Sequence, residues 1–104
     1  MHPPVLLLIS TDPHTGPLLE QALDHLRATI ILVETTEEGL RILKDRADLA
    51  LVVCDESQGR IASPVILSQA RRIAHNLPVI ILGTDGSAKA AVEALHRGAT
   101  DYLA

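Results

Sequence analysis

The chain has 104 residues, a length suited to one domain with a single hydrophobic core. Hydrophobic residues make up 47% of it and aromatic residues 1%, so the core must consist of aliphatic side chains, which favours buried parallel strands and an α/β fold. The net charge of −4 argues against a direct nucleic-acid partner, because binding to the phosphate backbone requires a basic face.

Neither a membrane span nor a disulfide is expected. No apolar run approaches the roughly 20 residues that cross a bilayer, and the run at residues 5–9 lacks the basic flank of a signal peptide, so we expect a cytoplasmic protein without membrane contact. Cys54 is the single cysteine and lies in an apolar run, which predicts a buried thiol. The five histidines show no metal-ligand spacing and are expected at the surface.

Short apolar segments without polar alternation predict five strands that are covered on both faces. They lie at residues 5–9, 29–33, 49–54 and 79–82, and a fifth begins near Tyr102.

The first two helices are predicted from apolar residues at helical spacing and from a capping pattern. Pro17 suits the first turn of a helix. The inner face of that helix is predicted to comprise Leu18, Leu19, Ala22, Leu23 and Leu26. Thr35, with Glu38 three residues later, predicts a capping box at the start of the second helix.

The last two helices each follow a serine that can accept a backbone hydrogen bond. Ser63 precedes Pro64 and is expected to cap a helix over residues 65–75. Ser87 is expected to cap a helix that stops at Gly98 in the left-handed conformation. The inner face of this last helix is predicted to comprise Ala88, Ala91, Val92 and Leu95.

The alternation of strands and helices predicts a doubly wound parallel sheet of five strands, in the flavodoxin-like order 2-1-3-4-5, over residues 1–104. A fifth helix is missing from the sequence, so apolar surface beside strand five is expected to be exposed. In such a sheet the ligand site lies at the carboxyl ends of the strands. The loops there carry four carboxylates, which suit a hard cation such as Mg²⁺: Asp12, Asp55, Glu56 and Asp85.

The whole chain resembles the receiver domain of response regulators in two-component signalling. The sequence LVVCD at 51–55 resembles the third strand and its phosphoacceptor, and PVIILGTDGSAKAAVEALHRGATDYL at 78–103 resembles the fourth strand, fourth helix and fifth strand. The resemblance implies that Asp55 is the phosphoacceptor and that Thr84 and Tyr102 are switch residues. The metal ligands that it implies are Asp12, Asp55 and Ser57.

The site departs from the family pattern at three positions. Ser10 and Thr11 stand where typical members carry two adjacent acids, Gly83 stands at the switch hydroxyl, and the lysine after strand five would follow Ala104. Weak Mg²⁺ binding and slow phosphoryl transfer at Asp55 are therefore expected, because positioning and charge neutralisation carry this chemistry.

Less specific interpretations remain open for each residue. Asp55 could be a polar strand end, with the register slipped so that Val53 takes the acceptor position. Asp12 could be a turn residue, and Tyr102 an amphipathic ring with its hydroxyl in solvent. Ordinary solvated loop residues are the alternative for Glu56, Thr84 and Asp85.

Three functions follow from these observations. The first is a degenerate receiver that works by protein contact with a sensor histidine kinase or other phosphodonor, with an output domain or partner protein, and with a second copy as a homodimer. The alternative is an orthodox Mg²⁺-dependent receiver that uses Asp55 with Asp12 and Glu56. The third, a small flavodoxin-like enzyme, is disfavoured because no glycine-rich phosphate loop follows the first strand.

Overall fold

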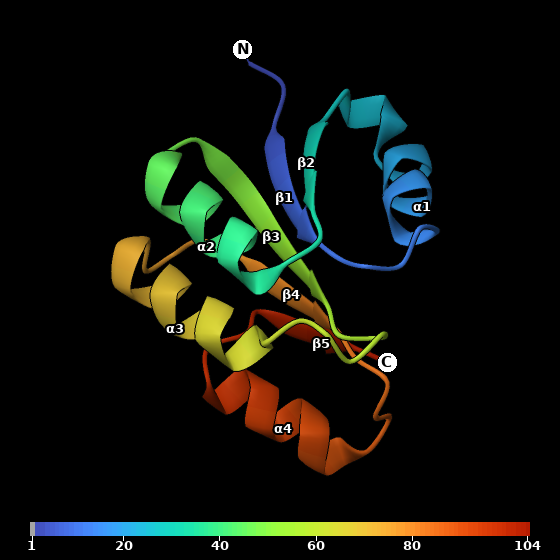
Figure 1. Ribbon diagram of the computed structural model, residues 1–104, viewed down its shortest axis with the longest axis vertical. Helices are drawn as coiled ribbons and strands as arrows, with labels where there is room; N and C mark the ends of the chain where they lie inside the picture. Colours follow the sequence, from blue (N-terminus) through green and yellow to red (C-terminus); the bar gives the residue numbers. More distant parts are fainter. Residues whose placement is uncertain (1) are drawn as a thin grey trace.

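A computed structural model describes residues 2–104 and contains one parallel sheet in the order β2-β1-β3-β4-β5 (Figure 1). The strands are β1 (Val5–Ile9), β2 (Thr29–Val33), β3 (Leu49–Asp55), β4 (Val79–Leu82) and β5 (Asp101–Leu103). This order confirms the predicted flavodoxin-like, doubly wound sheet.

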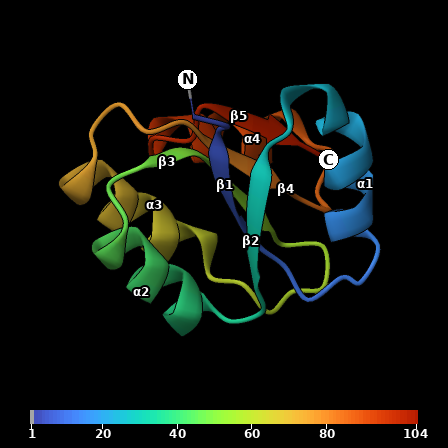
Figure 2. The ribbon, with the colours of Figure 1, turned by 90° about the horizontal axis from the view of Figure 1, so that it is seen from above.

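Helices cover both faces of the sheet. They are α1 (Thr15–Ala22), α2 (Thr36–Asp45), α3 (Ser63–Ile73) and α4 (Ala88–His96). Figure 2 shows α1 on one side of the strands and α2 and α3 on the other. Of the helices in residues 2–104, none has the length and apolar character that a membrane span requires.

The main core lies between the sheet and the helices α2, α3 and α4 on one of its faces. Ile9, Cys54 and Ile81 on adjacent strands are at most 1% exposed and belong to one cluster with Ile66 of α3. Ala94 of α4 packs against the same cluster. The aliphatic, nearly aromatic-free composition is thus accommodated by strands that are buried on both faces in the middle of the sheet.

The opposite face is covered unevenly. Leu8 and Val53 pair across β1 and β3 and are buried, whereas Leu103 at the end of β5 is 50% exposed. Ile80 and Leu82 of β4 lie between these extremes. Because side chains alternate along a strand, these residues share the face that carries α1, and α1 contacts the sheet at β2, on the far side from β5. Apolar surface therefore remains open over β4 and β5.

Helix α1 is shorter than predicted, and part of its expected inner face is wrong. The helix ends at Ala22, and a short 3₁₀ turn at Asp24–Leu26 follows. Leu18 is 64% exposed and Leu26 47% exposed. The helix instead buries Thr15 and Gly16, and Gly16 lies next to Leu32 of β2.

The expected cap of α3 is wrong, whereas the expected cap and stop of α4 are confirmed. Ser63 is the first residue of α3 and does not cap it; the cap position is Ala62, which makes no side-chain hydrogen bond. Ser87 does cap α4, since its Oγ accepts from the Ala90 N–H at 3.1 Å. Gly98 has a φ of 105° after α4, as predicted for a left-handed stop.

The inner face of α4 is made of alanines. Ala90, Ala91 and Ala94 are half-buried, while the predicted inner residues Val92 and Leu95 are 50% and 47% exposed. Both stripes have helical spacing, so spacing alone does not decide which faces inward. The smaller side chains face the sheet where the helix lies against β5.

Candidate functional site at Asp55

Asp55 is the last residue of β3, at the carboxyl edge of the sheet between β1 and β4. It pairs with Leu82 of β4, and the preceding Cys54 pairs with Ile9 of β1. The residue is only 3% exposed. Val53, the position implied by a slipped register, lies within the strand beside Leu8 and Ile80.

Three donors hold both carboxylate oxygens of Asp55. The Ser10 hydroxyl donates to Oδ2 at 2.8 Å, and the Thr15 hydroxyl donates to the same oxygen at 2.7 Å. The Ser57 backbone N–H donates to Oδ1 at 2.9 Å. We refer to Ser10, Thr15 and the Ser57 N–H as the donor set of Asp55.

The segment that connects β1 to α1 positions both hydroxyls. Ser10 directly follows β1, and its backbone N–H donates to the Val33 carbonyl at 2.9 Å, which continues the pairing with β2. Its Oγ accepts from the Asp12 N–H at 3.0 Å, so the hydroxyl proton is left for Asp55. Thr15 is the first residue of α1 and is buried. Sequence reasoning missed Thr15; a hydroxyl residue in the first turn after a central strand was the available signal.

The donor set determines the charge state of Asp55. Burial by itself would raise the pKa of this carboxyl, but hydrogen bonds from Ser57, Thr15 and Ser10 favour the charged form and hold the pKa below its ordinary value. The neighbouring Cys54 behaves oppositely: burial, and secondarily the nearby Glu56 carboxylate, raise the pKa of its thiol to about 12. Cys54 is thus a buried, unreactive thiol, as its sequence context predicted.

The other predicted site residues are engaged elsewhere. The Asp12 carboxylate accepts from the His14 N–H at 2.9 Å, and the Asp85 carboxylate accepts from the Ser87 N–H at 2.8 Å. Both bonds are typical of local turns. Ser57 reaches Asp55 through its backbone N–H, and the side chain of Thr84 is exposed.

The residues at this edge fit Mg²⁺ poorly. Across residues 2–104 there is no group of three His, Cys, Asp or Glu side chains placed to hold a metal ion. Both oxygens of Asp55 already accept hydrogen bonds, and the Ser10 hydroxyl points a proton toward Oδ2. A cation would have to displace these donors and would meet few carboxylates in return, whereas Mg²⁺ sheds its water reluctantly.

Tyr102 lies beside the same edge but on the opposite face of the sheet from Asp55. Its hydroxyl donates to the Asp85 carbonyl at 2.8 Å, and its ring packs against the main core. A Cβ added at Gly83 would meet the ring and hydroxyl of Tyr102. Gly83 stands at the position expected for the switch hydroxyl, and the Tyr102 phenol occupies the space that a side chain there would take.

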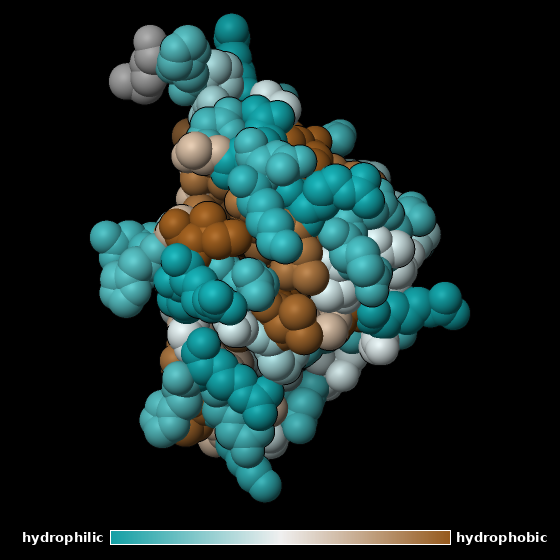
Figure 3. Space-filling model, turned by 60° about the vertical axis from the view of Figure 1, so that its left-hand side comes forward, coloured by the Kyte–Doolittle hydropathy of each residue, from teal (hydrophilic) through white to brown (hydrophobic). Residues whose placement is uncertain are grey.

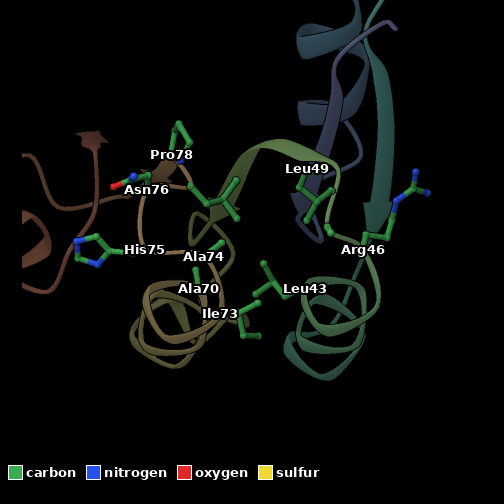
Figure 4. Close-up of a pocket in the computed structure, with 11 residues that line it drawn as sticks. Leu43, Arg46, Leu49, Ala70, Ile73, Ala74, His75, Asn76 and Pro78 are labelled. Atoms are coloured by element: carbon green, nitrogen blue, oxygen red, sulfur yellow. The ribbon is translucent and has the colours of Figure 1, made fainter.

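A hollow lies at the other end of the sheet from Asp55. It is a groove of about 520 Å³ between α2 and α3, with Leu43 and Ala70 at its buried base and Arg46 and His75 among its lining residues (Figure 4). Figure 3 shows hydrophobic residues gathered in the middle of the face that carries these helices. Among these lining residues, Arg46 is paired with Asp48 at 2.7 Å.

Comparison with known proteins places this arrangement in a family. The chain is 31% identical over 101 residues to the transcriptional regulatory protein GlrR of Escherichia coli K12, and 32% identical over 100 residues to the transcriptional regulatory protein CpxR of the same strain. The alignments cover 97% and 94% of this chain, but 22% and 41% of those regulators. No family model matches the chain.

Solved structures agree with the sequence relatives. A response regulator in red light signaling of R. palustris superposes with a TM-score of 0.81 at 23% identity, over 96% of this chain and 79% of that one. An orphan response regulator of H. pylori also superposes with a TM-score of 0.81, at 20% identity, over 96% of this chain and 80% of that one. The chain is a response-regulator receiver domain. The predicted family and fold are therefore confirmed, and two-component signalling is the process in which such domains serve.

Proposed function

We propose that this receiver domain acts as an atypical signalling module, in which Asp55 is held by hydroxyl and amide donors instead of by Mg²⁺. The observation that carries the proposal is the pair of bonds from Ser10 and Thr15 to one oxygen of Asp55. Ser10 and Thr11 replace the acidic pair that the family resemblance leads one to expect, and Ser10 donates to the carboxylate that an acid in its place would repel.

The same donors oppose phosphoryl transfer to Asp55. Each carboxylate oxygen has two lone-pair acceptor sites, and on Oδ2 both are taken by hydroxyl hydrogen bonds, which makes this oxygen a poorer nucleophile. The incoming phosphoryl oxygens also need positive charge nearby. Among residues 2–104 the single ion pair joins Arg46 and Asp48, which lie at the other end of the sheet, and Asp55 receives only neutral donors. Asp55 is in the acceptor position, but its carboxylate oxygens already accept hydrogen bonds from Ser10, Thr15 and the Ser57 N–H.

Incubation with acetyl phosphate and Mg²⁺ tests this directly. We expect no lasting phosphate adduct on the chain by intact-mass spectrometry, because Mg²⁺ binds weakly and Oδ2 is engaged. The matched variant Ser10→Asp/Thr11→Asp restores a carboxylate pair and is expected to gain Mg²⁺ binding. A stable single adduct on the unmodified chain that Asp55→Asn abolishes would contradict the proposal and support the orthodox Mg²⁺-dependent alternative.

Partners are part of the proposal. A receiver domain with a TM-score of 0.79 and 18% identity, over 96% of this chain and 77% of that one, was solved with the histidine phosphotransfer protein Ypd1 of Saccharomyces cerevisiae. By this analogy we propose contact with a histidine kinase or phosphotransfer protein. The transcriptional regulators related to the chain support an output domain or partner protein and a cytoplasmic location. Because the net charge is −4, we also propose that nucleic acid is not a direct partner.

We further propose that the chain forms a homodimer through the open face over β4 and β5. Leu103 is 50% exposed there and Ile80 and Leu82 are half-buried, so the face offers contiguous apolar positions on neighbouring strands. Light scattering across a concentration series should show a dimer, and Leu103→Glu should weaken it. Val92→Glu, at an equally exposed position on α4, is the control. A clean monomer at high concentration would contradict this proposal.

A further inference from the structure

Gly83 and Tyr102 form a steric pair at the carboxyl end of β4. A Cβ built on Gly83 would collide with the Tyr102 phenol, at both the ring and the hydroxyl. The register explains the contact: Leu82 pairs with Leu103, and the Gly83 N–H donates to the Leu103 carbonyl at 2.7 Å. The ring of Tyr102 therefore lies against the backbone of residue 83, where glycine is the one residue type that leaves room for it.

The hydroxyl of Tyr102 extends this contact into the loop that starts α4. It donates to the Asp85 carbonyl at 2.8 Å, while the Asp85 carboxylate accepts from the Ser87 N–H. Ser87 in turn caps α4. A continuous series of contacts thus joins the last strand to the first turn of the helix, through a loop that also carries Thr84.

Conformational strain is not the reason for glycine at position 83. The positive-φ glycines of the described chain are Gly59 and Gly98, so an alanine at position 83 would have ordinary backbone angles. Gly86, three residues later in the same loop, has open space: its Cβ would lie 4.0 Å from the nearest atom, the Cβ of Ala104. Of these two glycines, only Gly83 has the tyrosine packed against it.

We propose that Gly83 and Tyr102 form a lock that fixes the ring over β4 and holds the β4–α4 loop and the surface of α4 in one arrangement. Tyr102 is a positioning residue in this account and does not alternate between two positions. The inference departs from the switch role implied by the family resemblance, and it is independent of the chemistry proposed for Asp55.

A set of alanine variants tests the lock on the 104-residue chain. Gly83→Ala should expel the ring, which gives Tyr102 a solvent-like fluorescence and shifts the backbone amide resonances of residues 84–90. The thermal midpoint should fall by about 5 °C or more, since overpacking a small domain costs on this scale. Gly86→Ala is the matched control, with an unchanged tyrosine signal and an unchanged or slightly higher midpoint.

A second background separates the lock from a general need for glycine. In Tyr102→Val the obstacle is gone, so adding Gly83→Ala should no longer lower the midpoint. If Gly83→Ala alone does not fold, the double variant Gly83→Ala/Tyr102→Val should restore folding. The proposal is overturned if Gly83→Ala behaves like Gly86→Ala, if its cost persists in the Tyr102→Val background, or if the double variant also fails to fold.

Discussion

Replacement of Asp55 by alanine is expected to lower the free energy of unfolding by about 2 to 4 kcal/mol, because it leaves the buried hydroxyls of Ser10 and Thr15 without their acceptor. The sign of this change in the free energy of unfolding distinguishes two kinds of site. In a site where carboxylates repel one another, removal of one relieves that repulsion and increases stability. Here Asp55 is surrounded by donors, so its removal should be destabilising.

Urea unfolding measures this change, and two further variants give it a scale. Asp55→Asn should cost less than Asp55→Ala, because the amide oxygen can still accept from the hydroxyls while its NH₂ opposes the Ser57 N–H. Asp12→Ala removes only a local turn bond to the His14 N–H and should cost about 1 kcal/mol or less. A chain stabilised by Asp55→Ala would contradict the account of the donor set.

Arg71→Met is expected to destabilise the fold by about 2 to 3 kcal/mol, because it removes several hydrogen bonds from a charged donor. The guanidinium of Arg71 donates to the Gly98 carbonyl at 2.9 Å and to the Leu77 and His75 carbonyls at 2.7 and 3.1 Å. It thereby joins the end of α3 to the turn between α4 and β5. Leu77 is nearly buried, so its carbonyl would lose its partner away from water.

The neighbouring residue of the same helix supplies the control for this measurement. Arg72 is exposed, and Arg72→Met should change the free energy of unfolding by about 0.5 kcal/mol or less. Equal effects of the two substitutions in chemical denaturation would show that the carbonyl contacts of Arg71 contribute nothing specific.

The strands were predictable because their signal is local and strong. Continuous aliphatic runs such as residues 5–9 have no other stable place in a 104-residue domain than the middle of a sheet, and the intervening helices impose parallel pairing. Helix orientation was less predictable. On α4 the alanine stripe and the stripe with Val92 and Leu95 have the same spacing, and the alanines are the ones that face the sheet where the helix lies against β5.

The site was predictable in position but not in contacts. The end of β3 placed Asp55 at the carboxyl edge, since strand ends follow from the apolar pattern. That Ser10 and Thr15 converge on one oxygen depends on how the β1–α1 segment folds back, which involves residues 40 or more positions from Asp55. The packing of Tyr102 on Gly83 likewise depends on strand register and not on any local pattern.

The pKa of Asp55 links the donor set to stability. A carboxyl whose pKa is lower in the folded than in the unfolded chain stabilises the fold fully above the unfolded-state value. That contribution is lost as pH falls from the unfolded-state pKa, about 3.9, through the lower folded-state value. Thr15→Val removes one donor and should bring the folded-state pKa closer to the unfolded one, which makes the acid loss of stability from this group smaller.

The most direct test follows the side-chain carboxyl carbon of Asp55 by NMR, in a pH titration without Mg²⁺ and in a Mg²⁺ titration at neutral pH. We predict that the carboxyl titrates below the ordinary aspartate range without metal, and that its resonance shows no saturable change at sub-millimolar Mg²⁺. An ordinary or raised pKa in the absence of metal, or saturation by sub-millimolar Mg²⁺, would contradict the claim that hydroxyl and amide donors hold Asp55 in place of a cation.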